Sequence, residues 1–244
     1  MKELVQYERL YLPRLGTRKL YYLLKNQFIA ADIKIGRDAL FTYLKHQHML
    51  IKPLKSYHKT TQSKHWLHKH PNLVKDFKVK QPEQLWVADI TYIETKEETG
   101  YLSLITDAYS RKIVGHYLHH SLHTEGVYKA FNQALKKRIY KHQLIHHSDR
   151  GLQYCSSMYQ QLHTKNNVIC SMTDGYDCYQ NALAERINGI LKHEFLITKP
   201  NNLDQARVMI NQAVETYNNR RPHLALKYKT PDYVHKQKAL ANIN

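Results

Sequence analysis

The spacing of apolar residues changes character near residue 55 of the 244-residue chain. Before that point, apolar positions recur every three or four residues at 20–24 and again at 38–45, which is the period of an α-helix. A short stretch that contains Gly36 joins the two expected helices. Residues 1–55 are therefore predicted to form a small all-α helix-turn-helix unit, with a plain helical hairpin as the alternative.

From residue 85 onward the pattern is that of an α/β domain. Residues 85–93 (LWVADITYI) form an almost unbroken apolar and β-branched run, as expected of a central strand covered on both faces. Four further strands are expected at about 101–106, 112–118, 144–147 and 168–172, and helices at about 124–138, 157–166, 180–195 and 203–219. Three meandering strands followed by alternating helices and strands are typical of the ribonuclease-H-like fold. Residues 83–240 are therefore predicted to form a mixed α/β sheet with flanking helices.

The charge balance indicates a polyanionic partner. The formal net charge is +17 and the pI is near 9.6, an excess that nucleic acid would neutralise. A membrane partner is disfavoured because no run of 18 apolar residues exists and the first residues, charged throughout, do not form a signal peptide. A structural nucleic-acid-binding protein remains open on these grounds.

Cysteine and histidine usage adds little. The three cysteines show no CxxC spacing, which favours reduced thiols and a cytoplasmic protein. Histidine runs such as residues 146–147 lack companion cysteines at zinc-finger spacing, so scattered surface and DNA-facing histidines are the favoured interpretation.

The basic residues gather in the first third of the chain. Arg18, Lys19 and Arg37 lie in the predicted helical unit, which we therefore expect to bind DNA. Residues 56–82 are polar, basic and without a clear period, so they are predicted to be a linker that lies on DNA or stays mobile.

Asp89 lies in the middle of the first predicted strand. Val87 and Ile93 share its face by the two-residue period, so the carboxylate is expected to be buried. An isolated carboxylate there would cost several kcal/mol unless it were paired or bound to a metal. An aspartate satisfied by a buried arginine or by backbone amides is the alternative.

Asp149 follows the fourth predicted strand. Loops at the carboxyl ends of strands are where α/β sheets place functional groups, and Gly151 would let the chain turn sharply beside a ligand. The alternative is a turn aspartate that caps the next helix or bonds its own backbone.

Glu185 lies on the predicted helix 180–195. At about 100° per residue it falls nearly opposite the apolar stripe of that helix, with Asn181, Asn188 and Lys192 alongside. Taken alone, it would be an ordinary solvent-exposed glutamate.

The three acidic residues are more informative together. They come from a strand, a strand end and a helix that converge at one edge of a ribonuclease-H-like sheet, and 35 residues separate Asp149 from Glu185. Converging carboxylates repel one another and are hard oxygen donors, which suit Mg²⁺ or, in its place, Mn²⁺. Two such ions about 4 Å apart would serve an in-line phosphoryl displacement. Asp89, Asp149 and Glu185 are therefore the predicted catalytic and metal-binding residues.

Five stretches carry a resemblance to a known family. They are residues 86–93 (WVADITYI), 107–115 (DAYSRKIVG), 146–154 (HHSDRGLQY), 181–186 (NALAER) and 217–223 (YNNRRPH). The chain resembles, over nearly its whole length, the OrfB product of insertion sequences of family three, whose catalytic core is similar to retroviral integrases. The family's D,D(35)E triad carries over onto Asp89, Asp149 and Glu185. Residues 171–177 resemble the loop before the catalytic glutamate, and Asp174 and Asp177 fall too early for that spacing.

The resemblance implies a DNA transposase that cleaves 3′ ends and joins them to target DNA without a covalent protein intermediate. It also implies an oligomer on DNA, in the bacterial cytoplasm at the nucleoid. The family's active enzyme is usually a frameshift fusion with an upstream OrfA product, which carries a coiled-coil segment. No heptad run is visible in the chain, so we expect it to be the OrfB part.

Three further residues are candidates for DNA contacts near the metals. Lys192 shares the helix face of Glu185, and His147 and Arg186 are weaker candidates. Residues 217–223 are expected to pack rather than to touch DNA. Two rival functions stay open, a catalytically inactive DNA-binding regulator and a hydrolytic nuclease on the same fold.

Overall fold

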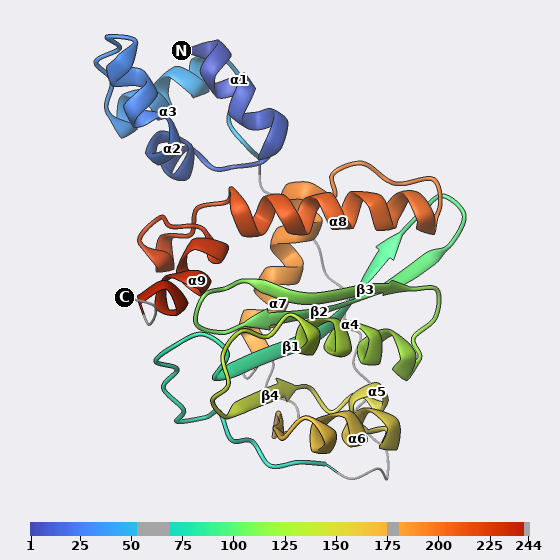
Figure 1. The fold of residues 1–244 in the computed structure, drawn as a ribbon. Coiled ribbons are helices and arrows are strands. Elements are labelled where there is room, and N and C mark those ends of the chain that lie inside the picture. Colours follow the sequence, from blue (N-terminus) through green and yellow to red (C-terminus); the bar gives the residue numbers. More distant parts are fainter. Residues whose placement is uncertain (53–68, 175–180, 242–244) are drawn as a thin grey trace.

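The computed structural model describes residues 1–52, 69–174 and 181–241, and its centre is a five-stranded mixed sheet. The strands are β1 (Leu85–Glu94), β2 (Thr99–Asp107), β3 (Ile113–His119), β4 (Leu144–Ser148) and β5 (Val168–Met172). Their order is β3-β2-β1-β4-β5: the first three pair antiparallel, and β4 and β5 continue in parallel beside β1 (Figure 1). The five predicted strands and the mixed sheet are therefore confirmed.

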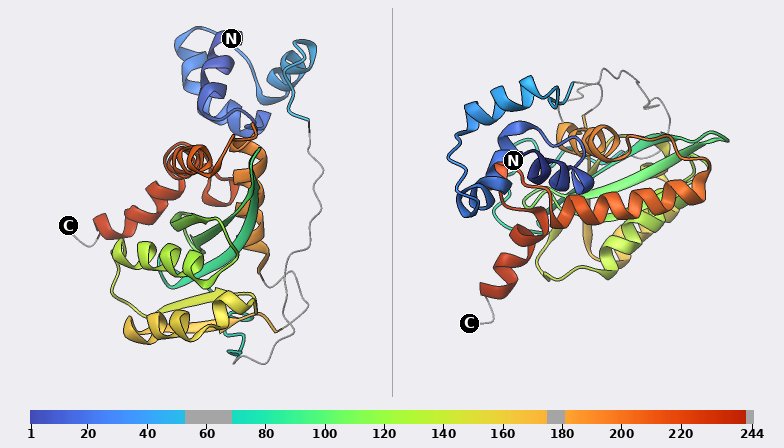
Figure 2. Two further views of the ribbon diagram at one scale, coloured as in Figure 1. Left: turned by 90° about the vertical axis from the view of Figure 1, so that its right-hand side faces the viewer. Right: turned by 90° about the horizontal axis from the view of Figure 1, so that it is seen from above.

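Helices cover both faces of the sheet. One face carries α4 (Thr124–Lys136), α5 (Leu152–Cys155) and α6 (Ser157–Lys165), and the other carries α7 (Ala182–Ile190), its π-helical continuation η2 (Leu191–Phe195) and α8 (Leu203–Asn219) (Figure 2). Trp86 and Phe131 are fully buried in the first layer, and Leu102 and Tyr217 in the second. This two-sided burial explains why the first strand lacks the alternation of a half-exposed strand.

The N-terminal unit has three helices in the described residues, one more than the pattern predicted. They are α1 (Lys2–Tyr11), α2 (Thr17–Ala30) and α3 (Arg37–His46). Leu20, Leu24, Leu40 and Leu44 form its fully buried core, whereas Phe41 is 48% exposed. Leu40 and Leu44 stand one helical turn apart, and Phe41 projects about 100° away from Leu40 and about 60° away from Leu44 around the helix axis.

The N-terminal unit packs against the core near the C-terminal end of α8 (Figures 1 and 2). Phe195 of η2 inserts into its hydrophobic cluster. The Arg220 guanidinium lies 3.8 Å from the centre of the Tyr11 ring and its Nη2 lies 3.6 Å from Glu8 Oε2. The Tyr22 and Tyr228 rings stack with their centres 4.5 Å apart.

The second part of the predicted linker packs on the core. Met172 donates a backbone hydrogen bond to Pro71 O, and the Leu73 amide donates to Ser171 Oγ at 2.9 Å. Val74 and Val79 pack against the cluster beneath β1. Residues 53–68 of the predicted linker lie outside the described residues.

The C-terminal part adds η3 (Leu224–Leu226) and the unpredicted α9 (Pro231–Ala241). Tyr217, Asn218 and Arg221 are buried, which confirms that residues 217–223 pack the core. Cys155 and Cys170 are buried free thiols. None of the helices in the described ranges combines the length and apolar character that crossing a bilayer requires.

Candidate active site

Asp89 lies at the centre of β1, opposite Leu104 of β2, with its carboxylate directed to the α7 side. Asn188 Nδ2 donates a hydrogen bond to Asp89 Oδ2 at 2.7 Å. Burial raises the pKa of Asp89 to about 7, and the negative charge of Asp149 adds to this effect, against the hydrogen bond from Asn188. No cation offsets this rise in pKa, and the buried-arginine alternative for Asp89 finds no support among the described residues.

Asp149 follows β4 directly and lies at the carboxyl end of that strand. Because β4 runs parallel to β1, with Val87 opposite His147, Asp149 comes beside the Asp89 side of the sheet. Asp149 Oδ1 accepts a hydrogen bond from the Gly151 amide at 3.0 Å. A Cβ on Gly151 would lie 3.1 Å from that oxygen, so the glycine permits the close turn. Asp149 therefore makes the turn hydrogen bond that was the alternative to a functional role, and its negative charge still acts on Asp89 and Glu185.

Glu185 stands in the first turn of α7 and is exposed. Burial, and then the charge of Asp149, raise the pKa of Glu185 above its usual value. Asn181 and Asn188 were expected on the exposed face of the helix with Glu185. Both are instead buried, with exposed fractions of 5% and 4%. Asn181 Nδ2 donates a hydrogen bond to Ala88 O at 2.9 Å. One side of α7 therefore packs on β1, and Glu185 stays accessible.

The charge of Asp149 acts on both Asp89 and Glu185, and we call these three carboxylates the acidic site. Asp149 raises the pKa of both other acids, which is the repulsion expected of converging carboxylates. Within the described ranges, no group of three or more His, Cys, Asp or Glu side chains is assembled closely enough to hold a metal ion. The donor chemistry nevertheless fits a hard divalent cation, because all three are carboxylates and the buried Asn188 Oδ1 beside them has no hydrogen-bond partner.

The predicted DNA contacts near the acidic site differ in accessibility. Arg186 is exposed next to Glu185, and Lys192 is half-buried in η2. His147 is fully buried in β4, where its Nδ1 lies 2.9 Å from Ser171 Oγ. A side chain shielded in this way does not reach a DNA backbone, so His147 drops out of the set of contacts.

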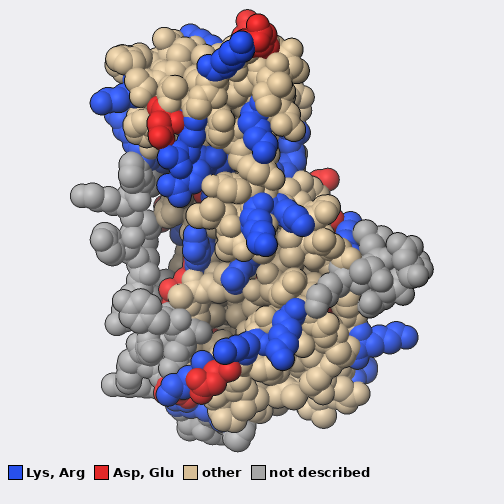
Figure 3. Space-filling view, turned by 90° about the vertical axis from the view of Figure 1, so that its left-hand side faces the viewer, with Lys and Arg blue, Asp and Glu red and all other residues tan. Residues whose placement is uncertain are grey.

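The N-terminal candidates are also unequal. Arg18 is exposed on α2, whereas Arg37 pairs with its neighbour Asp38 at 2.8 Å. Lys19 is half-buried: burial, followed by repulsion from Arg221, lowers the pKa of Lys19 to about 8. Figure 3 shows Lys and Arg side chains over both the N-terminal unit and the core, with few Asp and Glu among them.

The two acidic residues set aside by spacing do not join the acidic site. Asp174 is exposed, and its Oδ2 accepts a hydrogen bond from Asn72 Nδ2 at 3.3 Å. Asp177 lies outside the described residues. Asn188 was expected beside Glu185 on the exposed face of the helix, and its burial and its hydrogen bond to Asp89 were not predicted.

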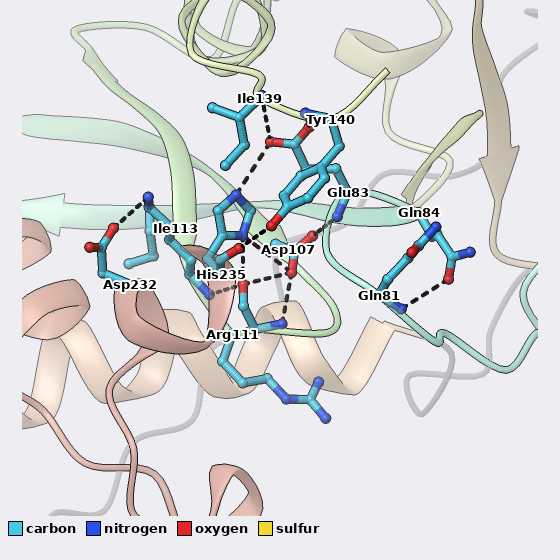
Figure 4. Close-up of polar contacts among 12 residues, drawn as sticks. Gln81, Glu83, Gln84, Asp107, Arg111, Ile113, Ile139, Tyr140, Asp232 and His235 are labelled. Carbon is cyan, nitrogen blue, oxygen red and sulfur yellow. Dashed lines mark hydrogen bonds and ion pairs between the residues drawn. The ribbon is translucent and has the colours of Figure 1, made fainter. Parts of the chain in front are cut away.

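A second buried carboxylate cluster, which we call the α9 network, lies at the start of β1. Glu83 and Asp107 are buried there with Ser110 and with His235 of α9 (Figure 4). Asp107 accepts hydrogen bonds from the Glu83 amide at 2.6 Å and from the Ser110 amide and hydroxyl at 2.7 and 2.6 Å. Its carboxylate is therefore satisfied without a metal.

Comparison with known protein families identifies the same core. Two models described as "Integrase core domain" match residues 79–178 and 166–231. The uncharacterized 31 kDa protein of insertion element IS600 from Shigella sonnei is 36% identical over 219 residues, which is 88% of this chain and 79% of that protein. The transposase of IS904 from Lactococcus lactis is 37% identical over 66% of this chain, and the match spans 65% of its own length. The match with the IS629 transposase from Shigella sonnei spans 50% of that protein.

Solved structures agree on the fold. The HTLV-2 integrase catalytic core domain in complex with magnesium gives a TM-score of 0.52 at 23% identity, over 64% of this chain and 97% of that one. A chain of the simian T-cell lymphotropic virus intasome in complex with PP2A regulatory subunit B56 gamma gives a TM-score of 0.57 at 16% identity, over 95% of this chain and 74% of that one. At these identities the likeness establishes the ribonuclease-H-like fold alone.

Proposed function

Because the chain belongs to the family of insertion-sequence proteins that carry an integrase core domain, we propose that it is a DNA transposase subunit that cleaves 3′ ends and transfers strands. More narrowly, we propose that it is the OrfB part of a family-three element. It acts as an oligomer on transposon ends and target DNA, with an OrfA product or as an OrfA–OrfB fusion, at the nucleoid of the bacterial cytoplasm. The intasome in which a structural relative is found is consistent with assembly on DNA.

One observation carries the catalytic part of the proposal. Asp149 raises the pKa of Asp89, which lies on a strand, and of Glu185, which lies on a helix. This mutual effect of carboxylates from three separate elements supports a common metal site for Asp89, Asp149 and Glu185. A solved relative of the same fold is described in complex with magnesium, and we propose Mg²⁺, with Mn²⁺ as substitute, for this chain.

The chain's own residues would act as ligands and as positioning groups. Asp89, Asp149 and Glu185 hold the cations, a pair of which would activate the attacking oxygen and stabilise the leaving one in an in-line phosphoryl transfer. Asn188 fixes the orientation of Asp89 through its 2.7 Å hydrogen bond. Arg186 and Lys192 stand on the same helical segment, from which they would contact the backbone of the bound strand.

The reaction then has two displacements of the same kind. A water oxygen attacks a phosphorus atom at the transposon end, the bond from phosphorus to the 3′ oxygen breaks, and that oxygen leaves as a 3′-OH. The 3′-OH next attacks a phosphorus atom of the target, forms the new phosphodiester and releases a target 3′-OH. The protein forms no bond to DNA in either step.

A strand-transfer assay tests this function against its rivals. The substrate is a labelled duplex that carries the terminal inverted repeats flanking the gene, with a plasmid as target, in Mg²⁺ and in excess chelator, with and without the OrfA product. We expect joined product only with Mg²⁺. Cut but unjoined DNA would establish a hydrolytic nuclease, and bound but intact DNA would establish a regulator.

A further inference from the structure

A second group of polar side chains lies where the N-terminal unit meets the core. It consists of Lys19 from α2, Arg111 from the β2–β3 turn, Arg186 from α7, and Arg221 and His223 from the segment after α8. The charges of Arg221, Lys19, Arg111 and Arg186 all act on His223 and, together with burial, hold its pKa far below the usual value. We call these five residues the junction cluster.

The junction cluster is built on a fixed frame. Arg221 is 2% exposed and forms a two-pronged pair with Glu194, with Nε and Nη2 at 2.7 and 2.6 Å from the carboxylate oxygens. Arg221 Nη1 lies 3.2 Å from His223 Nε2, which accepts in the neutral imidazole. Tyr217 donates from its hydroxyl to Arg111 O at 2.8 Å. These bonds hold the backbone and the central guanidinium in place.

The acidic neighbours of Lys19 and Arg111, which are Glu194 and Asp107, are already bonded to other residues. Glu194 is the acidic neighbour of Lys19, and Arg221 already occupies both of its oxygens. In the part of the chain that the structure describes, Lys19, Arg111 and Arg186 form no ion pair with a carboxylate. The Arg111 side chain points away from the α9 network (Figure 4), and burial lowers its pKa. Burial of the Lys19 and Arg111 charges without an ion pair is costly, and Arg186 adds an exposed charge near them, so the cluster is complementary to a negative ligand.

The position of the cluster identifies that ligand. Arg186 follows Glu185 directly on α7, so an anion held by Arg186 lies beside the acidic site. We propose that Lys19, Arg111 and Arg186 bind backbone phosphates of the DNA strand held at the acidic site. This inference rests on the proposed function, and it makes the N-terminal unit part of the strand-binding surface of its own core. Arginine and lysine are the donors that phosphates take in proteins.

The first test measures the salt dependence of duplex binding. Full-length protein, Arg111→Gln and Arg186→Gln are titrated onto a labelled 30-base-pair duplex without divalent metal, roughly the length that covers one end. Each substitution removes one phosphate contact, so the slope of log K against log salt should fall by about 0.9. Lys136→Gln is the matched control, because Lys136 is exposed on α4, on the other face of the sheet, and its slope should not change.

The second test isolates Lys19 by its proton. At pH 8 a lysine with a pKa of about 8 is half-charged, and a bound phosphate should complete its protonation. Calorimetric titration in two buffers of different ionisation enthalpy should show uptake of about half a proton by the wild type. Lys19→Arg keeps the positive charge and should lose that uptake while keeping its affinity. Arg186, Arg221, Glu194 and His223 face Lys19 and are unchanged in this comparison.

The outcomes separate this inference from the proposed function. Unchanged salt slopes in Arg111→Gln and Arg186→Gln, or proton uptake retained by Lys19→Arg, would overturn the junction cluster as a phosphate site. Neither result touches strand transfer, because binding is measured without metal. Conversely, a wild type that joins no DNA would overturn the proposed function, and reduced slopes would still support the phosphate site.

Discussion

Two carboxylate clusters on the same sheet differ in how the negative charge of their acids is compensated. In the α9 network, Asp107 accepts three hydrogen bonds, and the backbone amides of Ile139 and Tyr140 donate to Glu83 at 3.1 and 2.9 Å. In the acidic site, Asp89 accepts a side-chain hydrogen bond from Asn188 and faces other acids. The first cluster is complete without a ligand, whereas the second gains from a cation.

The difference separates an aspartate that is satisfied within the fold from one that repels its acidic neighbours. Both Asp89 and Asp107 lie on central strands, and both occur in stretches that resemble the family. They differ in their surroundings: hydrogen-bond donors outnumber negative charges around Asp107, and they do not around Asp89. His235 brings a titratable donor to within 3.3 Å of Glu83 and 3.7 Å of Asp107, whereas Asp149 brings Asp89 another negative charge. Four experiments test this contrast.

The largest expected effect is on chemistry. Asp89→Asn, Asp149→Asn and Glu185→Gln each keep the shape of the side chain and remove a metal ligand. Each should lower cleavage and joining by roughly a thousandfold or more, because charge stabilisation and metal activation supply several kcal/mol of the barrier reduction. Labelled-end assays in Mg²⁺ measure both steps, and DNA binding should persist.

Asp174→Asn is the matched control, since Asp174 is an exposed carboxylate outside the acidic site. It should retain near wild-type activity. Full activity in any one of the three acidic-site variants would remove that residue from the site, and loss of activity together with unfolding would assign it a structural role.

The second effect falls on stability. Asp107→Ala leaves the amides of Glu83 and Ser110 buried without an acceptor, and it removes a partner of the Ser110 hydroxyl and of His235. The free energy of unfolding should fall by about 3–5 kcal/mol, as for other broken buried pairs. Urea titration followed by circular dichroism measures the loss. A change of less than about 1 kcal/mol would mean that the α9 network does not hold the fold.

The two clusters also show which features of the fold could be predicted from the sequence and which could not. The run at 85–93 predicted a strand buried on both faces, and the sheet confirms it, because such burial leaves a local apolar pattern. The 35-residue spacing predicted the three acids, and their role in catalysis stays a prediction. The α9 network could not be predicted, since His235 meets Glu83 from 152 residues away and through polar atoms that leave no apolar period. Helix α1 was missed for a similar reason: its buried positions include Glu8 beside Val5.

Asn188 shows the limit within a helix that was predicted. The apolar stripe of α7 indicates one buried direction, and the opposite side was therefore expected to be exposed. In the structure α7 crosses β1, so a second flank is covered and Asn181 and Asn188 meet the strand. Helical periodicity reports the main packing direction, and a contact between polar atoms on a flank depends on how elements are placed in space.

The third prediction concerns metal-free stability at the acidic site. The pKa of Asp89 rises from 3.8 to about 7 on folding. Below about pH 4 the group is protonated in both states. Between pH 4 and 7 the unfolded chain releases the proton while the folded chain keeps it, so stability falls as pH rises, and the cost persists above pH 7. Asp89→Asn removes this cost and can pair reciprocally with the unpartnered Asn188 Oδ1.

Asp89→Asn should therefore unfold at a higher urea concentration than the wild type at pH 7.5 in chelator, by on the order of 1–3 kcal/mol. The gain should vanish towards pH 4, and Mg²⁺ should stabilise the wild type but not the variant. A variant that is less stable at pH 7.5 would show that Asp89 is a structural residue like Asp107.

The smallest expected effect is the contribution of His235 in the α9 network to the dependence of stability on pH. Burial lowers the pKa of His235, but the hydrogen bonds to Asp107 and Glu83 outweigh it and hold the pKa above its usual value. The folded state therefore binds the proton more tightly than the unfolded state. The resulting stability is fully present below the unfolded pKa, near 6.5, and is lost as pH rises through the folded pKa. Its size is about 1.4 kcal/mol for each pH unit that separates the folded and unfolded pKa values.

The measurement has to isolate His235 from the other buried histidines. His146 and His163, whose pKa values burial lowers, act with the opposite sign and below pH 6.5. The comparison is therefore made between pH 6.5 and 9, as the difference between wild type and His235→Gln. The wild type should lose stability over this range relative to the variant, because a glutamine amide has no proton to release. Parallel urea midpoints for the two proteins across the range would mean that His235 is neutral in the fold and that the α9 network is held by its uncharged hydrogen bonds alone.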